Sequence, residues 1–148
     1  RGLDFFEFDS SYVVYAKIQE TADSPPFKMK TTTDTPADFR KYGTLIFNIN
    51  DEQYTLTAYE NLDYLDVEGY ENYLFLPFLD KTNGYETYGG GRYIDLYQYD
   101  NDSILIDFNR AYNPQCVYDE NFSCPIVPRE NLLNFRVEAG VKNFISSY

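Results

Sequence analysis

The sequence of 148 residues lacks histidine altogether and contains only two cysteines. Histidine is the commonest general base and the commonest ligand of transition metals, so its absence excludes the Ser-His-Asp and Cys-His arrangements of nucleophilic catalysis. Two cysteines are also too few for the usual closed zinc site. We therefore predict that the protein holds no metal and no cofactor.

Basic residues are scarce as well, because 12 Lys and Arg stand against 24 Asp and Glu and give a net charge of −12. Such a chain repels phosphate backbones and anionic lipid surfaces, so we expect no nucleic acid as a partner. Long apolar runs are missing too, and no transmembrane segment is predicted. The simplest interpretation of the negative charge is solubility. The sequence leaves the oligomeric state open.

Aromatic residues, in contrast, are abundant: 16 Tyr and 12 Phe make 19% of the chain. This content is too high for a disordered chain. Tyr and Phe favour strands and contribute large buried areas. A chain of this length suits one domain with its own core, so we predict a single β-rich domain over residues 1–148.

Alternation of apolar and polar residues predicts two hairpins. The first covers residues 44–60, where Asn and Asp in NINDEQ supply the turn, and the second joins 92–100 to 104–109. Further strands are expected at 11–20, at 27–33, at the start of 74–91, where Pro77 requires an edge or bulged strand, and at 132–140. A helix-start or turn signal lies in 34–43, and 110–131 is predicted to be loop. This pattern predicts an antiparallel all-β domain, either a sandwich or a partly open barrel, with little helix.

Three stretches carry a family resemblance: GYETYGGGRYIDL, LIDFNRAYNPQCVYDENFSCPIVPREN and VEAGVKNF. Together with RGLDFF and PFKMKTTT they resemble the signature of an uncharacterised family, the domain of unknown function 1684. The family name carries no known activity. Many relatives have Gly-Glu-Lys where this chain has Gly140-Val141-Lys142, so any role of that acid is absent here. A lipoprotein or secretory signal often precedes the domain in similar members. The resemblance thus implies an exported or lipid-anchored precursor, with the cytoplasm as the alternative.

The segment DFNRAYNP, residues 107–114, places an acid, two amides and a guanidinium directly after a predicted strand. Arg110 offers five donors in a fixed fork that can bind a carboxylate in two-pronged fashion. Asn109 can hold a tight turn, and Phe108 is expected to face the core. The candidate ligand-binding residues are Tyr88, Arg92, Asp107, Asn109, Arg110 and Tyr112.

Three hypotheses about function follow from this cluster. In the first, which we favour, the domain binds a small polar molecule or a peptide in a cleft lined by Tyr and Arg. In the second it is a hydrolase or lyase, with Asp107 as acid or base and with Arg92, Asn109 and Arg110 stabilising negative charge. In the third the cluster is purely structural: Arg92 or Arg110 pairs with Asp107, and the Asn side chains close the loop.

Two further features lie on either side of this cluster. The three glycines at 89–91 are expected to form a bulge or bend at the entry to a strand, because no helix follows them as a phosphate-binding loop requires. Cys116 and Cys124 lie close together in a Pro-rich loop. In an exported protein this spacing favours a disulfide, and the alternative is a pair of free thiols.

Overall fold

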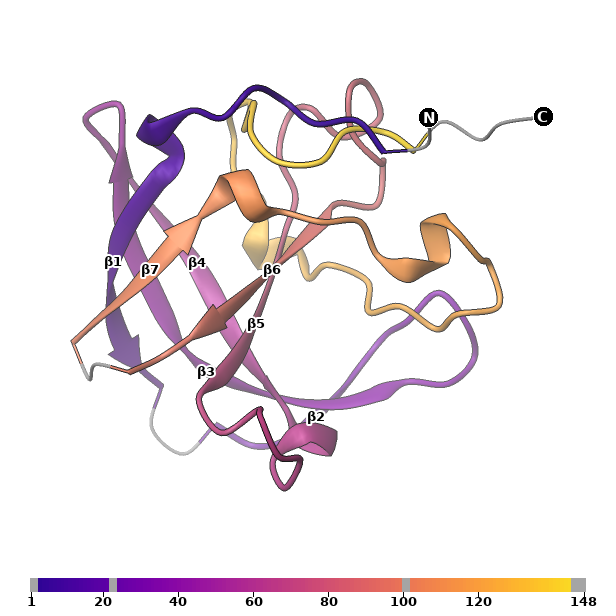
Figure 1. Ribbon diagram of the computed structural model, residues 1–148. Coiled ribbons are helices and arrows are strands. Elements are labelled where there is room, and N and C mark those ends of the chain that lie inside the picture. Colours follow the sequence, from indigo (N-terminus) through magenta and orange to yellow (C-terminus); the bar gives the residue numbers. More distant parts are fainter. Residues whose placement is uncertain (1–2, 22–23, 100–101, 145–148) are drawn as a thin grey trace.

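The structure is a computed structural model that describes residues 3–21, 24–99 and 102–144. One antiparallel sheet curls into a nearly closed barrel (Figure 1), which confirms the all-β prediction. Its strands are β1 (Val13–Glu20), β2 (Phe27–Met29), β3 (Ala37–Ile49), β4 (Glu52–Asn61), β5 (Tyr73–Phe78), β6 (Arg92–Tyr97) and β7 (Ser103–Asp107). Helical structure in the described residues is limited to three-residue 3-10 turns. Within these ranges, the chain has no helix with the length and hydropathy needed to cross a bilayer.

The strands lie in the order β6-β5-β4-β3-β1-β7, with β2 added to the side of β3. Consecutive strands β6 and β7 therefore form the two ends of the order. The curl of the sheet brings them next to each other (Figure 1), but the described residues show no pairing register between them. The predicted hairpin of 92–100 with 104–109 is wrong, because in the described residues β6 pairs with β5 and β7 pairs with β1 but not with each other.

The hairpin predicted at 44–60 is confirmed as the β3–β4 pair, whose turn holds Asn50 and Asp51 at φ 52° and 68°. The helix or turn signal at 34–43 was wrong, because β3 already starts at Ala37 and pairs with β2 and β4. Tertiary pairing here overrides a weak local signal.

A β-bulge lies between Lys41 and Gly43 in β3. One extra residue in a strand moves the following side chains to the opposite face of the sheet. Before the bulge, Phe39 therefore faces the outside of the barrel, whereas Leu45 and Phe47 after it face the interior. The bulge lets one long strand serve two hydrophobic layers.

Two hydrophobic clusters result. The larger fills the barrel and includes Leu45, Phe47, Leu76, Ile94, Leu96, Ile106 and Phe108. The smaller lies on the outer face and consists of Met29, Phe39, Tyr59, Phe75, Tyr93 and Val127. The long segment after β7 passes across this outer face (Figure 1) and covers it. Burial of large aromatic residues on both faces is the main stabilising contribution.

Pro77 does not mark an edge strand, because β5 lies between β4 and β6. In the described residues β4 and β5 pair at one position, with Tyr59 opposite Phe75. Beyond it the buried Asn131 side chain takes the place of the ladder. It accepts from the Thr57 N–H at 2.8 Å and donates to the Thr57 carbonyl at 2.8 Å and the Pro77 carbonyl at 2.7 Å. Although Pro77 has no backbone N–H to donate, the Thr57 carbonyl therefore still has a donor.

The strand predicted at 132–140 is also wrong. Apart from an isolated bridge between Leu79 and Leu132, this segment has no strand partner within the described part of the chain. Its alternating apolar residues are buried, but the carbonyls of Val137 and Ala139 accept hydrogen bonds from the Arg92 guanidinium instead of from a strand. A buried cation thus anchors an extended segment that the alternation alone could not distinguish from a strand.

Candidate functional site

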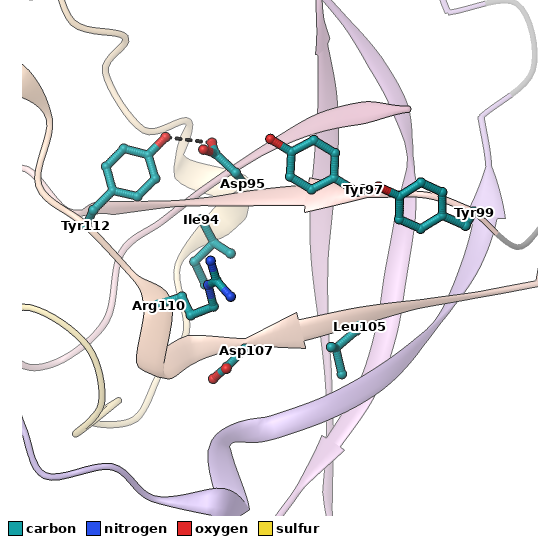
Figure 2. A pocket seen from close by; sticks show the side chains of 8 residues that line it. All are labelled: Ile94, Asp95, Tyr97, Tyr99, Leu105, Asp107, Arg110 and Tyr112. Carbon is teal, nitrogen blue, oxygen red and sulfur yellow. Dashed lines mark hydrogen bonds between the residues drawn. The ribbon is translucent and has the colours of Figure 1, made fainter. Parts of the chain in front are cut away.

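A cavity of about 460 Å³ lies on the outer face of the barrel, where β6 and β7 approach each other without pairing. We call it the β6–β7 groove. It is lined by Ile94, Asp95, Tyr97, Tyr99, Leu105, Asp107, Arg110 and Tyr112 (Figure 2). Its walls come from β6, from β7 and from the turn that follows β7. The groove therefore exists because the sheet curls into a barrel but does not close.

Backbone polar groups point into the groove from β6. Tyr93 and Tyr112 exchange two N–H to carbonyl hydrogen bonds of 2.9 Å each, so the backbone of Tyr93 points away from β5. In an antiparallel strand every second residue points its backbone groups to the same side. Asp95 and Tyr97 therefore direct their N–H and carbonyl groups toward β7.

The β7 side follows the same alternation. The Ile18 N–H donates to the Asp102 carbonyl at 3.3 Å and continues the β1–β7 register. Even-numbered β7 residues thus bond to β1, and Leu105 directs its backbone groups into the groove. The groove ends at the Tyr93–Tyr112 bridge on one side.

Asp95 organises one wall of the groove. Its Oδ1 accepts from the Tyr112 hydroxyl at 2.6 Å and from the Tyr73 hydroxyl at 2.9 Å (the Tyr112 bond is drawn in Figure 2). Burial, followed by the nearby Asp95, raises the pKa of Tyr112 above its usual range. The pKa of Tyr73 is raised as well, mainly by burial. Both hydroxyls thus stay protonated donors and hold the Asp95 carboxylate in place.

Arg110 enters the groove from a 3-10 turn, Phe108–Arg110, that is firmly fixed. The Asp107 Oδ1 accepts from the Asn109 backbone N–H at 3.0 Å and from its side-chain amide at 2.9 Å. The Asn109 side chain also exchanges two 3.0 Å hydrogen bonds with the backbone of Asp9. Phe108, fully buried as expected, anchors the same turn in the barrel.

The Arg110 side chain itself is exposed and lies between the two strands (Figure 2). Within residues 3–21, 24–99 and 102–144 it makes no ion pair, although Asp95 and Asp107 line the same groove. The predicted pairing of Arg110 or Arg92 with Asp107 is therefore not formed. The guanidinium keeps its donors available to an anion, and each carboxylate keeps a second oxygen for donors.

Half of the six predicted ligand-binding residues meet in the groove: Asp107, Arg110 and Tyr112. Asn109 lies beneath them and holds the turn. Arg92, in contrast, lies on the interior face of β6 with 0% of its surface exposed. Its guanidinium bonds to Asp80 Oδ1 at 3.3 Å, and burial lowers its pKa while Asp80 opposes that shift. Placing Arg92 in a cleft was wrong, because the alternation that buries Ile94 buries Arg92 too.

Tyr88 is also outside the groove. Its ring covers Gly90, and burial together with Cys116 raises the pKa of its hydroxyl. The expected bend at the glycines is present, since Gly91 has φ 96° and a Cβ there would meet the Phe78 carbonyl oxygen at 2.7 Å. Tyr88 therefore lies beside the cysteine loop and does not line the groove.

The prediction missed Asp95, Tyr97 and Tyr99, which supply the β6 wall. The sequence contained a signal for them, because alternation places Asp95 and Tyr97 on the face opposite Ile94. Their proximity to Arg110 depends on the curl of the sheet. The described residues contain no cluster of three or more His, Cys, Asp or Glu side chains suited to a metal ion.

Cys116 and Cys124 are close together, and both are free thiols in this structure. The Cys116 backbone N–H donates to the Cys124 Sγ at 3.0 Å. Burial, with the neighbouring Cys116 thiol as a further cause, raises the pKa of Cys124 to about 11. A raised pKa makes Cys124 a poor nucleophile at neutral pH. The disulfide between them stays a prediction.

A family model described as protein of unknown function, DUF1684, matches residues 1–142. The chain belongs to the DUF1684 family. A solution NMR structure of an uncharacterized protein from Haloarcula marismortui is 34% identical, with a TM-score of 0.75 over 96% of this chain and 76% of that one. Comparison with curated proteins gave no match. The family and the fold of this DUF1684 protein are therefore established, and we infer its function from the groove.

Proposed function

We propose that this DUF1684 protein binds a small polar ligand in the β6–β7 groove, with an anionic group of the ligand on Arg110. The observation that carries the proposal is the Arg110 guanidinium, which lies in a cavity of about 460 Å³ without an ion pair among the described residues. Arg129 also makes no ion pair in the described ranges, so what distinguishes Arg110 is its position in a cavity that Asp95 and Asp107 line as well.

The groove offers complementary chemistry around that cation. A guanidinium binds carboxylate or phosphate through two parallel N–H bonds. Asp95 and Asp107 can accept from hydroxyl or ammonium groups of the same ligand. Tyr97, Tyr99 and Tyr112 add ring surface and hydroxyls. A ligand with an anionic group and several hydroxyl or ammonium donors fits this set best.

The shape of the groove favours a small molecule over a long peptide. Its volume is within the range of small-molecule sites, roughly 300–1,000 Å³. The Tyr93–Tyr112 bridge bounds the groove at one end. An extended peptide that continued along β6 in that direction would meet this boundary.

The enzymatic alternative loses one of its residues, because Arg92 is buried on the other face of β6. It would then depend on Asp107 with Arg110. The Asp107→Asn variant separates the two functions, since a binding protein can retain affinity with an amide there, whereas an enzyme that uses the carboxylate as acid or base loses turnover.

The direct experiment is an NMR titration of the isotope-labelled protein with acetate, citrate, glucuronate and inorganic phosphate. We expect the amides of Asp95, Tyr97 and Tyr112 to shift saturably with at least one of these anions. The Arg110→Gln variant should bind that anion at least about tenfold more weakly, which corresponds to one charge-assisted contact.

Arg129→Gln is the matched control, because Arg129 is exposed, lies away from the groove and makes no ion pair in the described ranges. Its affinity should equal that of the unmodified protein. If no anion shifts the groove amides, or if Arg110→Gln binds as well as Arg129→Gln, the proposal is wrong.

A further inference from the structure

A second cavity, of about 300 Å³, lies next to the groove on the outer face of the barrel. The segment that follows Tyr112 forms its cover, and the strands β3, β5 and β6 form its floor. It is lined by Phe39, Asn61, Tyr64, Tyr73, Phe75, Tyr93, Tyr112, Gln115, Ser123, Cys124 and Pro125. None of these side chains is charged at neutral pH, in contrast to the groove. The cavity is therefore suited to an uncharged group.

The floor of this cavity consists of aromatic rings in contact with one another. Phe75 packs edge-on against Tyr93 at 4.7 Å between ring centres and lies 5.5 Å from Phe39. Tyr93 in turn packs edge-on against Tyr112 at 5.8 Å. Phe39, Phe75 and Tyr93 are almost completely buried. Aromatic rings favour such offset and edge-to-face contacts with a further ring.

Uncharged polar groups complete the cavity. The Gln115 side chain is exposed in the covering segment, and its amide makes no hydrogen bond in the parts of the chain described, whereas its backbone carbonyl accepts from Tyr118 and Asp119. Ser123 donates to the Thr31 hydroxyl at 2.9 Å, and Asn61 accepts from the Asp63 N–H at 3.0 Å. A hydroxyl or carbonyl on a bound ring could bond to the free Gln115 amide, whereas a charged group would find no counter-ion here.

The two cavities share one residue. Tyr112 lines both, and Tyr73 and Tyr112 donate to the same oxygen of Asp95, which lines the groove. Because the Tyr93–Tyr112 bridge closes the groove along the β6 backbone, a ligand with its anionic group by Arg110 would reach the second cavity over the Tyr112 side chain.

We propose that this second cavity binds an uncharged aromatic ring, carried by the ligand whose anionic group binds Arg110. The link to the anionic group rests on the proposed function, whereas the ring site rests on the cavity itself. The ligand class is then a small aromatic compound with a carboxylate or phosphate on a short linker.

Three probes test this proposal by NMR: phenol, acetate and 4-hydroxyphenylacetate, which joins the two. We expect phenol to shift the amides of Tyr93, Tyr112 and Cys124 saturably. The joined compound should bind at least tenfold more tightly than either fragment, because the second contact becomes intramolecular.

The Gln115→Trp variant is designed to fill the mouth of the cavity and should weaken phenol binding at least tenfold. Asn121→Trp is its matched control, since Asn121 is exposed in the same segment but does not line the cavity. It should bind phenol like the unmodified protein.

The outcomes separate the two proposals. If phenol leaves these amides unmoved, or binds equally to both Trp variants, the ring site is refuted. If acetate, citrate, glucuronate and inorganic phosphate all fail to shift the groove amides while phenol binds, the proposed function fails and the ring site stands. If both fragments bind but the joined compound gains nothing, the two cavities do not share one ligand.

Discussion

In the described part of the barrel, backbone pairing between neighbouring strands is interrupted between β4 and β5 and between β6 and β7. The two interruptions differ in what fills them. Between β4 and β5 the buried Asn131 side chain replaces the missing backbone bonds. Between β6 and β7 no side chain of the described residues replaces them, and a groove of about 460 Å³ remains, with an exposed Arg110 beside it.

The comparison shows that a gap between strands does not by itself imply a site. Unpaired backbone groups in a protein interior must be satisfied, and Asn131 meets this requirement at the first gap. At the second gap the edges of β6 and β7 face solvent, so a ligand can replace water there without leaving buried groups unsatisfied. The same distinction separates the two arginines, since Arg92 is paired and buried whereas Arg110 is neither.

The largest effect is expected from alkaline pH, which acts at both gaps. Tyr59 donates to Glu130 beside the filled gap, and Tyr73 and Tyr112 donate to Asp95 beside the groove. Burial raises the pKa of all three above the unfolded value, followed by the carboxylate for Tyr59 and Tyr112 and by Tyr112 and then Asp95 for Tyr73. Their contribution to stability is therefore complete below about pH 10 and is lost as the pH rises further. Urea unfolding midpoints should fall steadily above that pH, and a constant midpoint up to pH 11 would contradict this assignment.

The next largest effect concerns the two arginines. Replacing Arg92 by Met leaves the buried Asp80 without its counter-ion and frees three carbonyls of the C-terminal segment, which costs about 3–5 kcal/mol. Arg110→Met should change the free energy of unfolding by less than about 0.5 kcal/mol. Urea unfolding of both variants gives the comparison. Equal losses would mean that Arg110 has a structural role.

The gap between β4 and β5, which the Asn131 side chain fills, can be opened by the Asn131→Leu substitution. This change keeps the side-chain volume and removes three hydrogen bonds. Thr57 and Pro77 then keep unsatisfied backbone groups, and the expected loss is roughly 2–4 kcal/mol. Asn109→Leu at the groove is the matched control and should cost about 1 kcal/mol, because its bonds lie near solvent. Thermal unfolding measures both. A loss for Asn131→Leu no greater than that of the control would show that the gap is not held by this amide.

A smaller change is expected from oxidation of the cysteines. Joining Cys116 to Cys124 should stabilise the fold by roughly 2–3 kcal/mol if the bond forms without strain. Mass spectrometry before and after mild oxidation detects the bond, and chemical unfolding measures the gain. Cys116→Ser should show no gain under the same treatment. Two free thiols after oxidation would refute the predicted disulfide.

The sequence predicted those features that depend on local alternation. It identified the hairpin of β3 and β4, and it placed Phe108 in the core. It also placed Asp95 and Tyr97 on one face of β6, although their role was missed. The bulge before Gly43 was not foreseeable, because a register shift depends on the partner strand.

Other features depend on contacts between distant parts of the chain. Arg92 is held by Asp80 and by carbonyls of the C-terminal segment, and no local pattern encodes these bonds. The groove itself depends on how far the sheet curls, which brings β6 and β7 together without aligning them. Local patterns could therefore suggest Arg110 as a site residue but could not supply the wall that faces it.

Native-state hydrogen exchange of β6 and β7 tests the central claim most directly, because the claim is that these two edges do not pair. We predict an alternating pattern in which the amides of Asp95, Tyr97 and Leu105 exchange quickly, whereas those of Leu96 and Ile106 exchange slowly. Uniformly slow exchange along both strands would show that β6 and β7 form a continuous ladder, and the groove would then not be open.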